Sequence, residues 1–147
     1  MKEDLIKRLR LFLFNEKHQT LVGKPASQRE IIEAQQQLHV QFHSDYVAFI
    51  ETFGGAYAGI AIHAFSNCSS LGNETVVDLT LDFRQQYKEF LSPNVLETSY
   101  VISMDGGGNP IFIDPSGHVF ICDHDCGEIK RIADSFELLI EDCFYEW

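Results

Sequence analysis

The sequence predicts an α+β fold, a single domain (residues 1–147) in which helices come first, a mostly antiparallel sheet follows and a helix closes the chain. Apolar residues recur at helical spacing in the first half. Residues 100–132 instead hold short apolar segments separated by turn-forming residues, the pattern of a β-meander. At 147 residues, without an internal repeat or a linker, the chain has the length of one domain.

The first predicted helix covers residues 4–14, where apolar residues recur every three or four positions among basic ones. Residues 15–26 contain Gly23 and Pro25 and predict a connecting loop. Residues 1–24 are therefore expected to form an N-terminal helix and loop.

Two capped helices are predicted next. Ser27 opens the first of them, because Glu30 three residues later completes the capping-box pattern. The segment SDYVAFIETF, residues 44–53, predicts another helix with Ser44 as its cap. The two glycines that follow are expected to end it in the left-handed conformation.

The middle of the chain predicts one strand and one longer helix. Alternation in GIAIHAF indicates a strand over residues 59–65, in which His63 is interpreted as a hydrogen-bonded core histidine. Asn73 is the predicted cap of a helix whose apolar repeat runs from Val76 to Phe90. Pro93 is expected to stop this helix.

Four strands and a helix complete the prediction. The helix begins after Ser135, and DPSG at residues 114–117 matches a type I turn. The predicted strands are residues 100–104, 110–114, 118–123 and 128–132.

Composition excludes several classes of protein. The hydrophobic content of 45% is that of a folded globular chain. No apolar segment approaches the roughly 20 residues of a membrane span, and the first residues lack the apolar core of a signal peptide. We therefore expect a cytoplasmic protein with reduced cysteines and no membrane partner.

The net charge of −11 is unevenly distributed. Residues 1–72 hold seven basic and seven acidic residues, whereas residues 73–147 hold four basic and fifteen acidic ones. Such a field repels nucleic acids and attracts basic partners. A solvated acidic surface without any partner is equally compatible with this charge.

The glycines of DGGGN, residues 105–109, do not indicate a phosphate-binding loop. A dinucleotide fingerprint would need a third glycine at position 111, where the chain has Ile111. A predicted strand follows instead of a helix, so no helix N-terminus points at the loop. The segment is interpreted as a hairpin turn.

The polar segment CDHDCGE, residues 122–128, raises the question of a metal site. On an extended strand Cys122, His124 and Cys126 would share a face, and with His118 they could form a small metal-dependent hydrolase. However, the spacing is neither that of paired zinc ligands nor that of a calcium loop. We expect no enzyme activity, no cofactor and no resident metal.

Four segments resemble the Smi/Knr-type domain of the SUKH superfamily over residues 25–142. They are IIEAQQQL, VQFHSDYVAFIETFGG, DGGGNPIFID and VFICDHD, in this order. The family pattern L-P-x-D-Y-x-x-F-L is matched at Asp45, Tyr46 and Phe49. Two departures are His43 in place of proline and, before the glycine pair, Phe53 in place of asparagine.

The resemblance implies a non-catalytic α+β domain. Bacterial members are typically immunity proteins, which bind the toxin domain of a polymorphic toxin, often a nuclease, in the cytoplasm. The DGGGN and D-H-D segments are most similar to members paired with LXG-type toxins. Fungal relatives act in the regulation of cell-wall synthesis through protein contacts, so a regulatory or scaffolding module is the alternative.

The residues expected to bind a toxin are acidic side chains at the predicted turns and one aromatic anchor. A nuclease is basic because it binds phosphate, binding residues favour loops on a rigid sheet, and aromatic side chains often anchor interfaces. Tyr145 and Trp147 are further possible anchors, and the oligomeric state is left open. The expected residues are Asp105, Asp114, Asp123, Asp125, Glu128 and Tyr57.

Overall fold

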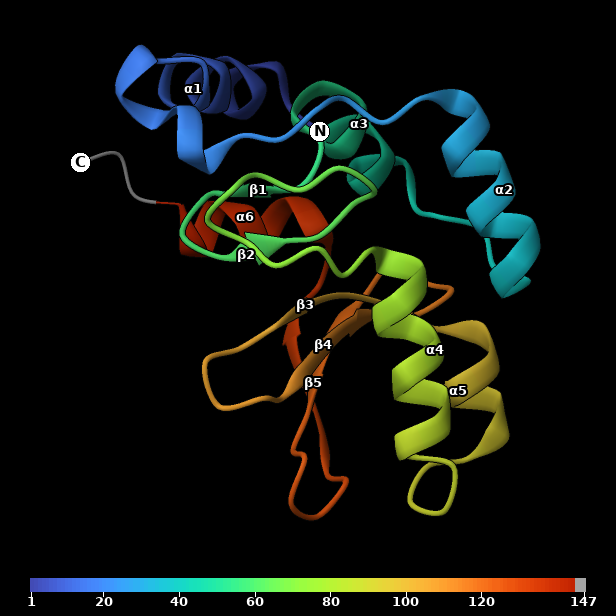
Figure 1. The fold of residues 1–147 in the computed structure, drawn as a ribbon. Coiled ribbons are helices and arrows are strands. Elements are labelled where there is room, and N and C mark those ends of the chain that lie inside the picture. Colours follow the sequence, from blue (N-terminus) through green and yellow to red (C-terminus); the bar gives the residue numbers. More distant parts are fainter. Residues whose placement is uncertain (145–147) are drawn as a thin grey trace.

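The computed structural model describes residues 1–144 and confirms the α+β fold in a single domain (Figure 1). Within this range no helix is long and apolar enough to cross a membrane. The elements are α1 (Glu3–Leu13), the 3₁₀ helix η1 (Glu16–Leu21), α2 (Gln28–Leu38), α3 (Ser44–Phe53), β1 (Ala56–Tyr57), β2 (Ala61–Ile62), α4 (Val76–Gln86), α5 (Pro93–Thr98), β3 (Tyr100–Met104), β4 (Pro110–Ile113), β5 (Val119–Cys122), β6 (Ile129–Ala133) and α6 (Phe136–Cys143).

The sheet β3-β4-β5-β6 is antiparallel throughout and separates two hydrophobic cores. Alternate residues of a strand point to opposite faces. Tyr100 and Ile102 therefore join the larger core with α1, α2, α3 and α6, whereas Val101 joins the smaller core with α4 and α5. Figure 1 shows α4 and α5 beside the sheet and α3 and α6 above it.

Tyr46 of α3 links the larger core to the strands. Its side chain is fully buried, and its hydroxyl donates to the carbonyl oxygen of His63 at 2.6 Å. The ring packs against Tyr100 of β3 and Phe136 of α6. Burial, followed by the proximity of Tyr100, raises the pKa of Tyr46 well above its ordinary value, so its hydroxyl remains a donor.

The start of α3 differs from the prediction. Ser44 is the first helical residue, and the cap position is His43, whose side chain makes no capping hydrogen bond. The φ of His43 is −68°, the value that a proline ring imposes. Its N–H donates to the Tyr100 hydroxyl at 2.8 Å, a bond that proline could not make. Histidine thus keeps the backbone conformation of the family's proline and adds a link to β3.

Of the helix caps predicted for α2 and α4, one is confirmed and one is wrong. The capping box of Ser27 and Glu30 is present at α2. At α4 the cap is Thr75, whose hydroxyl accepts the N–H of Asp78, so the prediction of Asn73 was wrong by two residues. Pro93 does not merely stop a helix, because it occupies the first turn of α5, where its missing N–H costs nothing.

The predicted strand 59–65 is shorter than expected. Only Ala61 and Ile62 pair with β1, because the N–H of His63 turns to the carbonyl oxygen of Ile102 on β3 at 2.9 Å. The four strands of the meander are confirmed to within one or two residues. The predicted turn at residues 114–117 carries the expected hydrogen bond, from the N–H of Gly117 to the carbonyl of Asp114 at 2.9 Å.

Arg84 links α4 to α2 and α5 through carbonyl oxygens of those two helices. Its guanidinium donates to Leu38 at the end of α2 at 2.7 Å, and to Leu96 and Glu97 of α5 at 2.8 and 3.2 Å. Carbonyls in the last turn of a helix have no partner within the helix. One side chain therefore satisfies the ends of two helices.

We expect Arg84→Met to lower the free energy of unfolding by about 2 kcal/mol, since hydrogen bonds to a charged group are lost while the aliphatic stem is kept. Urea denaturation measures this change. The control is Arg131→Met, which removes a surface ion pair with Asp134 and should cost less than about 1 kcal/mol. Equal losses in both variants would contradict the role of Arg84.

Candidate functional site

Three aspartates spaced nine residues apart, Asp105, Asp114 and Asp123, each open a hairpin turn. The Oδ1 atom of Asp105 accepts the backbone N–H groups of Gly107 and Asn109 at 2.9 and 2.8 Å. The other two aspartates accept N–H groups of their own turns in the same way, at 2.8–3.0 Å. These carboxylates therefore shape the turns, and the sequence signal that could have shown this is an aspartate followed three or four residues later by glycine.

The order of the strands separates the predicted residues into two groups. In an antiparallel meander, the β3–β4 and β5–β6 turns lie at one end of the sheet and the β4–β5 turn lies at the other. Asp105 therefore shares one end with Asp123, Asp125 and Glu128, whereas Asp114 lies at the opposite end. The structure does not bring all five acidic residues together.

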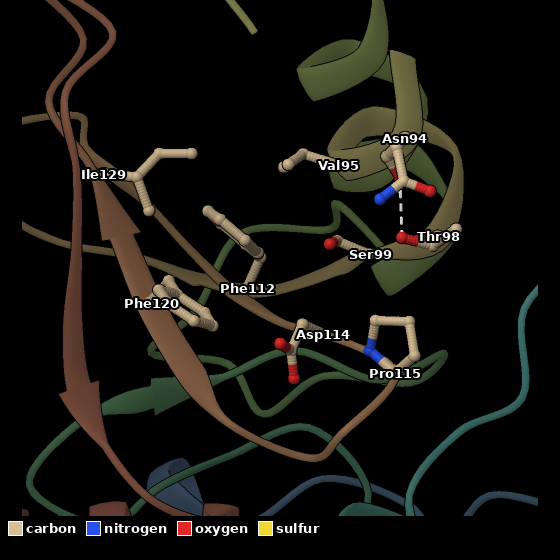
Figure 2. Close-up of a pocket in the computed structure, with 9 residues that line it drawn as sticks. All are labelled: Asn94, Val95, Thr98, Ser99, Phe112, Asp114, Pro115, Phe120 and Ile129. Atoms are coloured by element: carbon tan, nitrogen blue, oxygen red, sulfur yellow. Dashed lines mark hydrogen bonds between the residues drawn. The ribbon is translucent and has the colours of Figure 1, made fainter. Parts of the chain in front are cut away.

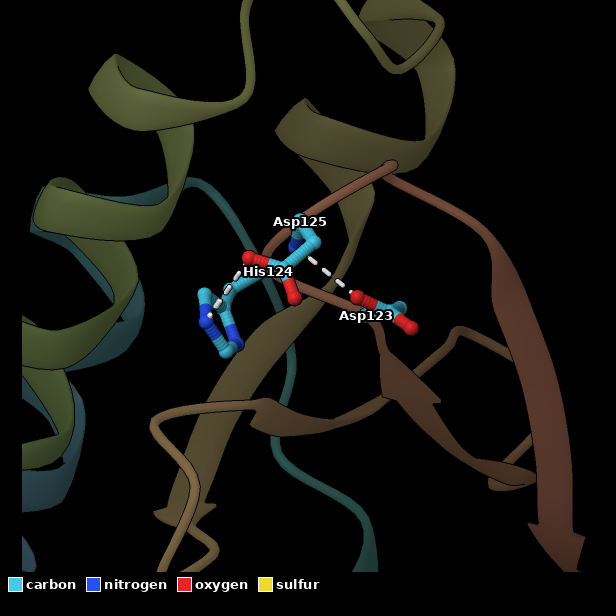
Figure 3. A group of neighbouring side chains, drawn as sticks. All are labelled: Asp123, His124 and Asp125. Carbon is cyan, nitrogen blue, oxygen red and sulfur yellow. Dashed lines mark hydrogen bonds and ion pairs between the residues drawn. The ribbon is translucent and has the colours of Figure 1, made fainter.

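A direct contact ties the two turns at the first end. The backbone N–H and the Nδ1 of His124 approach the Oδ1 of Asn109 at 2.9 and 2.7 Å. Asn109 also donates to the Oδ2 of Asp105 at 3.0 Å. Figure 3 shows the ring of His124 beside Asp125, whose carboxylate lies 3.1 Å from Nε2. Sequence reasoning did not identify this role of Asn109 and His124.

The α4–α5 loop, residues 87–92, completes this end of the molecule (Figure 1). Its Phe90 is 65% exposed, which corrects the prediction that Phe90 belongs to a buried helical stripe, since α4 already ends at Gln86. Phe90 lies against Gly127 of the β5–β6 turn, where an added Cβ would approach the Phe90 Cβ to 2.9 Å. We call residues 87–92, 105–109 and 123–128 together the hairpin end.

The carboxylates of the hairpin end differ in how far they are engaged. Asp105 is half-buried and accepts several hydrogen bonds. The Asp125 side chain is 84% exposed, and Glu128 is exposed as well. Asp125 and Glu128 are therefore the carboxylates best placed to meet a partner without disturbing the turns.

A shallow pocket of about 230 Å³ lies beside the β5–β6 hairpin. Asp123 and Glu128 line it together with Lys130, Asn109 and the edge of Ile121. Two carboxylates against one ammonium group leave this pocket with negative charge. It extends the acidic surface from the turns onto the face of the sheet.

Asp123, His124 and Asp125 each place one potential metal-ligand atom within 4.8 Å of the others. Within residues 1–144 this is the one cluster of three or more histidine, cysteine, aspartate or glutamate side chains that is close enough to hold a metal ion. All three are exposed. Their contacts in Figure 3 are with one another and with the backbone of their own turn. Exposed acidic groups commonly show such proximity without an ion, and no fourth histidine, cysteine, aspartate or glutamate joins this group among the described residues.

The residues considered for a metal-dependent hydrolase do not lie together in the structure. The expectation that Cys122, His124 and Cys126 share a strand face is wrong, because β5 ends at Cys122 and the chain turns. His118 lies in the turn at the other end of the sheet. Burial, followed by Asp123 and Cys126, raises the pKa of the Cys122 thiol to about 11, which keeps it protonated at neutral pH. All four cysteines are free thiols.

A second pocket, of about 140 Å³, lies between α5 and the sheet (Figure 2). Phe112 and Phe120 form its apolar floor, and Asp114 lies at its edge. The Oδ1 of Asp114 is engaged by the backbone of its own turn. The volume is below the roughly 300 Å³ of typical small-molecule sites, so this pocket does not indicate a substrate site.

Tyr57 lies apart from the hairpin end. It is half-buried on β1 and lines a separate pocket of about 420 Å³ together with His63 of the segment after β2. The other two aromatic candidates, Tyr145 and Trp147, fall outside the residues that the structure describes.

The last helix does not extend the acidic surface of the turns. Glu141 of α6 forms an ion pair with Arg8 of α1 at 3.3 Å. The carboxylate of Glu137 accepts the backbone N–H of Lys2 at 3.1 Å. These acidic side chains face α1, so the acidic excess of the second half is split between two regions.

A comparison with models of protein families shows to which family the chain belongs. The family model SUKH_5, described as SMI1-KNR4 cell-wall, matches residues 3–145. The chain belongs to the SMI1-KNR4 family. This confirms the resemblance to the SUKH superfamily and extends the matched region to α1, ahead of the expected start at residue 25. A search of curated proteins finds no match.

The charge of Asp105 gives a testable contribution to stability. Burial raises the pKa of Asp105, but hydrogen bonds from Asn109 and Gly107 outweigh it and hold the pKa below its ordinary value of 3.8. The unfolded chain therefore binds a proton first, so this stability is present at neutral pH and is lost as pH falls through the folded pKa.

Asp105→Asn keeps an oxygen acceptor for the turn but removes the titration. We expect the difference in unfolding free energy between pH 7 and pH 3 to be smaller in this variant than in the parent protein, as measured by urea denaturation. Asp82→Asn, which changes an exposed carboxyl on α4, is the control. An unchanged pH dependence in Asp105→Asn would contradict the role of the turn.

Proposed function

We propose that this member of the SMI1-KNR4 family is an immunity protein, which binds and neutralises the C-terminal domain of a secreted polymorphic toxin through the hairpin end. The supporting observation is the combination at that end of exposed carboxylates, Asp125 and Glu128, with the exposed ring of Phe90. An apolar anchor within a charged rim is the arrangement that protein interfaces use.

The chemistry of the partner follows from the sign of the charge. A nuclease toxin carries a basic surface because it must hold phosphate groups. An acidic surface competes for that site and accelerates association through long-range attraction. The proposed partner is therefore a basic toxin domain, a nuclease, and the mechanism is stoichiometric binding without catalysis, metal or cofactor.

The likeness of the DGGGN and D-H-D segments to members paired with LXG-type toxins makes such a toxin the proposed partner class. Neutralisation takes place in the cytoplasm, where a nuclease reaches its substrate. The tied turns of the hairpin end suit this role, because the bond from His124 to Asn109 fixes the surface before binding.

Co-expression tests the proposal. The toxin domain encoded beside this gene should arrest growth when expressed alone and not when this chain is co-expressed. The two purified proteins should form a 1:1 complex whose affinity falls with salt. Absence of a neighbouring toxin gene, together with absence of any basic protein retained by the immobilised chain, would overturn the proposal.

The double variant Asp125→Lys/Glu128→Lys should weaken the complex at least tenfold, mainly through slower association, because it reverses the field at the contact. Surface plasmon resonance at low and moderate salt measures both rates. Since both side chains are exposed, the thermal midpoint should stay close to that of the parent protein.

The matched control is Glu16→Lys/Glu51→Lys, which makes the same change in net charge at exposed positions of η1 and α3. This control should retain most of the affinity. Equal losses in the two double variants would show that net charge, and not the hairpin end, governs binding.

Phe90→Ala should raise the dissociation rate and lower affinity at least tenfold, because the ring is a large, exposed apolar side chain beside the acidic β5–β6 turn. Leu11→Ala, at a 70% exposed position of α1, is the control and should bind like the parent protein. Full affinity in Phe90→Ala would remove Phe90 from the proposed interface.

The alternative function is a regulatory or scaffolding module. The observation that favours it is the description of the matched family, which names the cell wall. In that case a pull-down should recover a partner other than a toxin, and deletion of the gene should alter growth without any toxin present.

A further inference from the structure

His63 follows β2 and is fixed from two sides. Its side chain is 8% exposed, and its backbone N–H donates to Ile102 of β3 at 2.9 Å. The ring nitrogen Nδ1 lies 2.6 Å from the carbonyl oxygen of Glu74. Because a carbonyl oxygen can only accept, Nδ1 carries the hydrogen of this bond.

Asn67 holds the segment that supplies this carbonyl. Its Oδ1 accepts the N–H of Ala64 at 2.9 Å, and its Nδ2 donates to the carbonyls of Gly72 and Glu74, both at 2.8 Å. Both hydrogens of the amide are thereby used, so the 3.3 Å approach of Nδ2 to the ring of His63 is a packing contact. The orientation of the ring is therefore set by the bond from Nδ1 to Glu74, and Asn67 holds that carbonyl in place.

The other ring nitrogen, Nε2, has no hydrogen-bond partner among residues 1–144. His63 lines the pocket of about 420 Å³ that also contains Tyr57, and Nδ1 is turned away toward Glu74. In the neutral imidazole with hydrogen on Nδ1, Nε2 is an acceptor. A side chain that is more than nine-tenths buried thus offers one unused lone pair to the pocket.

The walls of the pocket indicate which kind of hydrogen-bond donor could reach Nε2 of His63. Leu21 and Leu71 are apolar and suit an aliphatic stem, while Tyr57 supplies an aromatic surface and a hydroxyl. Among the described lining residues none is charged, and the net charge of −11 favours a cation. Lysine and arginine combine an aliphatic stem with nitrogen donors and a charge that aromatic rings attract.

We propose that the pocket formed by Tyr57 and His63 is a binding site for a lysine or arginine side chain of a partner protein, with Nε2 of His63 as acceptor. Where that partner is the toxin, this inference rests on the proposed function and adds a second contact away from the hairpin end. Tyr57 then acts as a wall of the site and not as an inserted anchor.

Butylguanidinium is the first probe, because it carries the stem and donors of arginine without a protein. Its addition to the ¹⁵N-labelled protein should shift the ring signals of His63 and the backbone amides of Ala61 and Leu71 saturably in the millimolar range. Tetramethylammonium is the control: it can approach the ring of Tyr57 but has no N–H to donate to Nε2, so its shifts should be several-fold weaker. Equal responses to both cations, or no response to butylguanidinium, would overturn the proposal.

His63→Asn is the matched variant, because the asparagine amide nitrogen can occupy the place of Nδ1 and keep the bond to Glu74, whereas Nε2 is lost. The amides of Ala61 and Leu71 should then no longer shift with butylguanidinium. A second variant, Ala61→Leu, leaves His63 unchanged and fills the half-buried wall of the pocket. Retained butylguanidinium binding in both variants would contradict the proposed site, and loss in Ala61→Leu with an unchanged thermal midpoint supports it even if His63→Asn fails to fold.

The toxin provides a separate readout. Both variants should weaken the complex about tenfold, while Asp125→Lys/Glu128→Lys should bind butylguanidinium like the parent protein. If no toxin binds the parent protein but butylguanidinium does, the proposed function fails and the site remains. If the toxin binds His63→Asn and Ala61→Leu like the parent protein and butylguanidinium does not bind, the site fails and the proposed function remains.

Discussion

A tyrosine hydroxyl buried in an apolar core must find an acceptor, and for Tyr46 that acceptor is the carbonyl oxygen of His63. This bond fixes α3 against the segment that follows β2. The backbone N–H of His63 in turn donates to the carbonyl oxygen of Ile102 on β3. The ring of Tyr46 also packs on Tyr100 of β3 and Phe136 of α6. Tyr46 therefore contacts both the sheet and the last helix. The orientation of His63, and hence of its free ring nitrogen, depends on this arrangement.

The fold presents two surfaces of different chemistry, the hairpin end and the pocket of Tyr57. Antiparallel order brings the turns of Asp105 and Asp123 to one end and carries Asp114 to the other. The carboxylates of the aspartates that open the turns accept hydrogen bonds from backbone N–H groups. Asp125 and Glu128 are therefore the carboxylates of this end that are exposed without such a role in a turn. The Tyr57 pocket lies beside β1 and has no charged lining residue among those described. A basic partner would thus meet charge at the turns and an aromatic, hydrogen-bonding recess elsewhere.

Local signals in the sequence predicted most elements but placed several boundaries wrongly. The capping box at Ser27 was confirmed because the side chain and the N–H that it binds are only three residues apart. At α4, Asn73 and Thr75 both have capping side chains, and the bond between Thr75 and Asp78 decided between them. The end of α4 was missed because the apolar repeat continues to Phe90 although the helix stops at Gln86. Helical periodicity does not reveal that the ring of Phe90 finds no core to cover it.

The sequence by itself determined the α+β class, the family, the four strands of the meander and the acidic excess of the second half. These depend on periodicity, turn residues and composition, which are local or summed properties. Only the tertiary structure decided which acidic residues lie together, that Phe90 is exposed beside them, and that His63 offers an acceptor to a pocket. Each depends on contacts between residues distant in the sequence, such as His124 with Asn109 and Tyr46 with His63. Strand order and core packing bring these pairs together, and no local pattern encodes them.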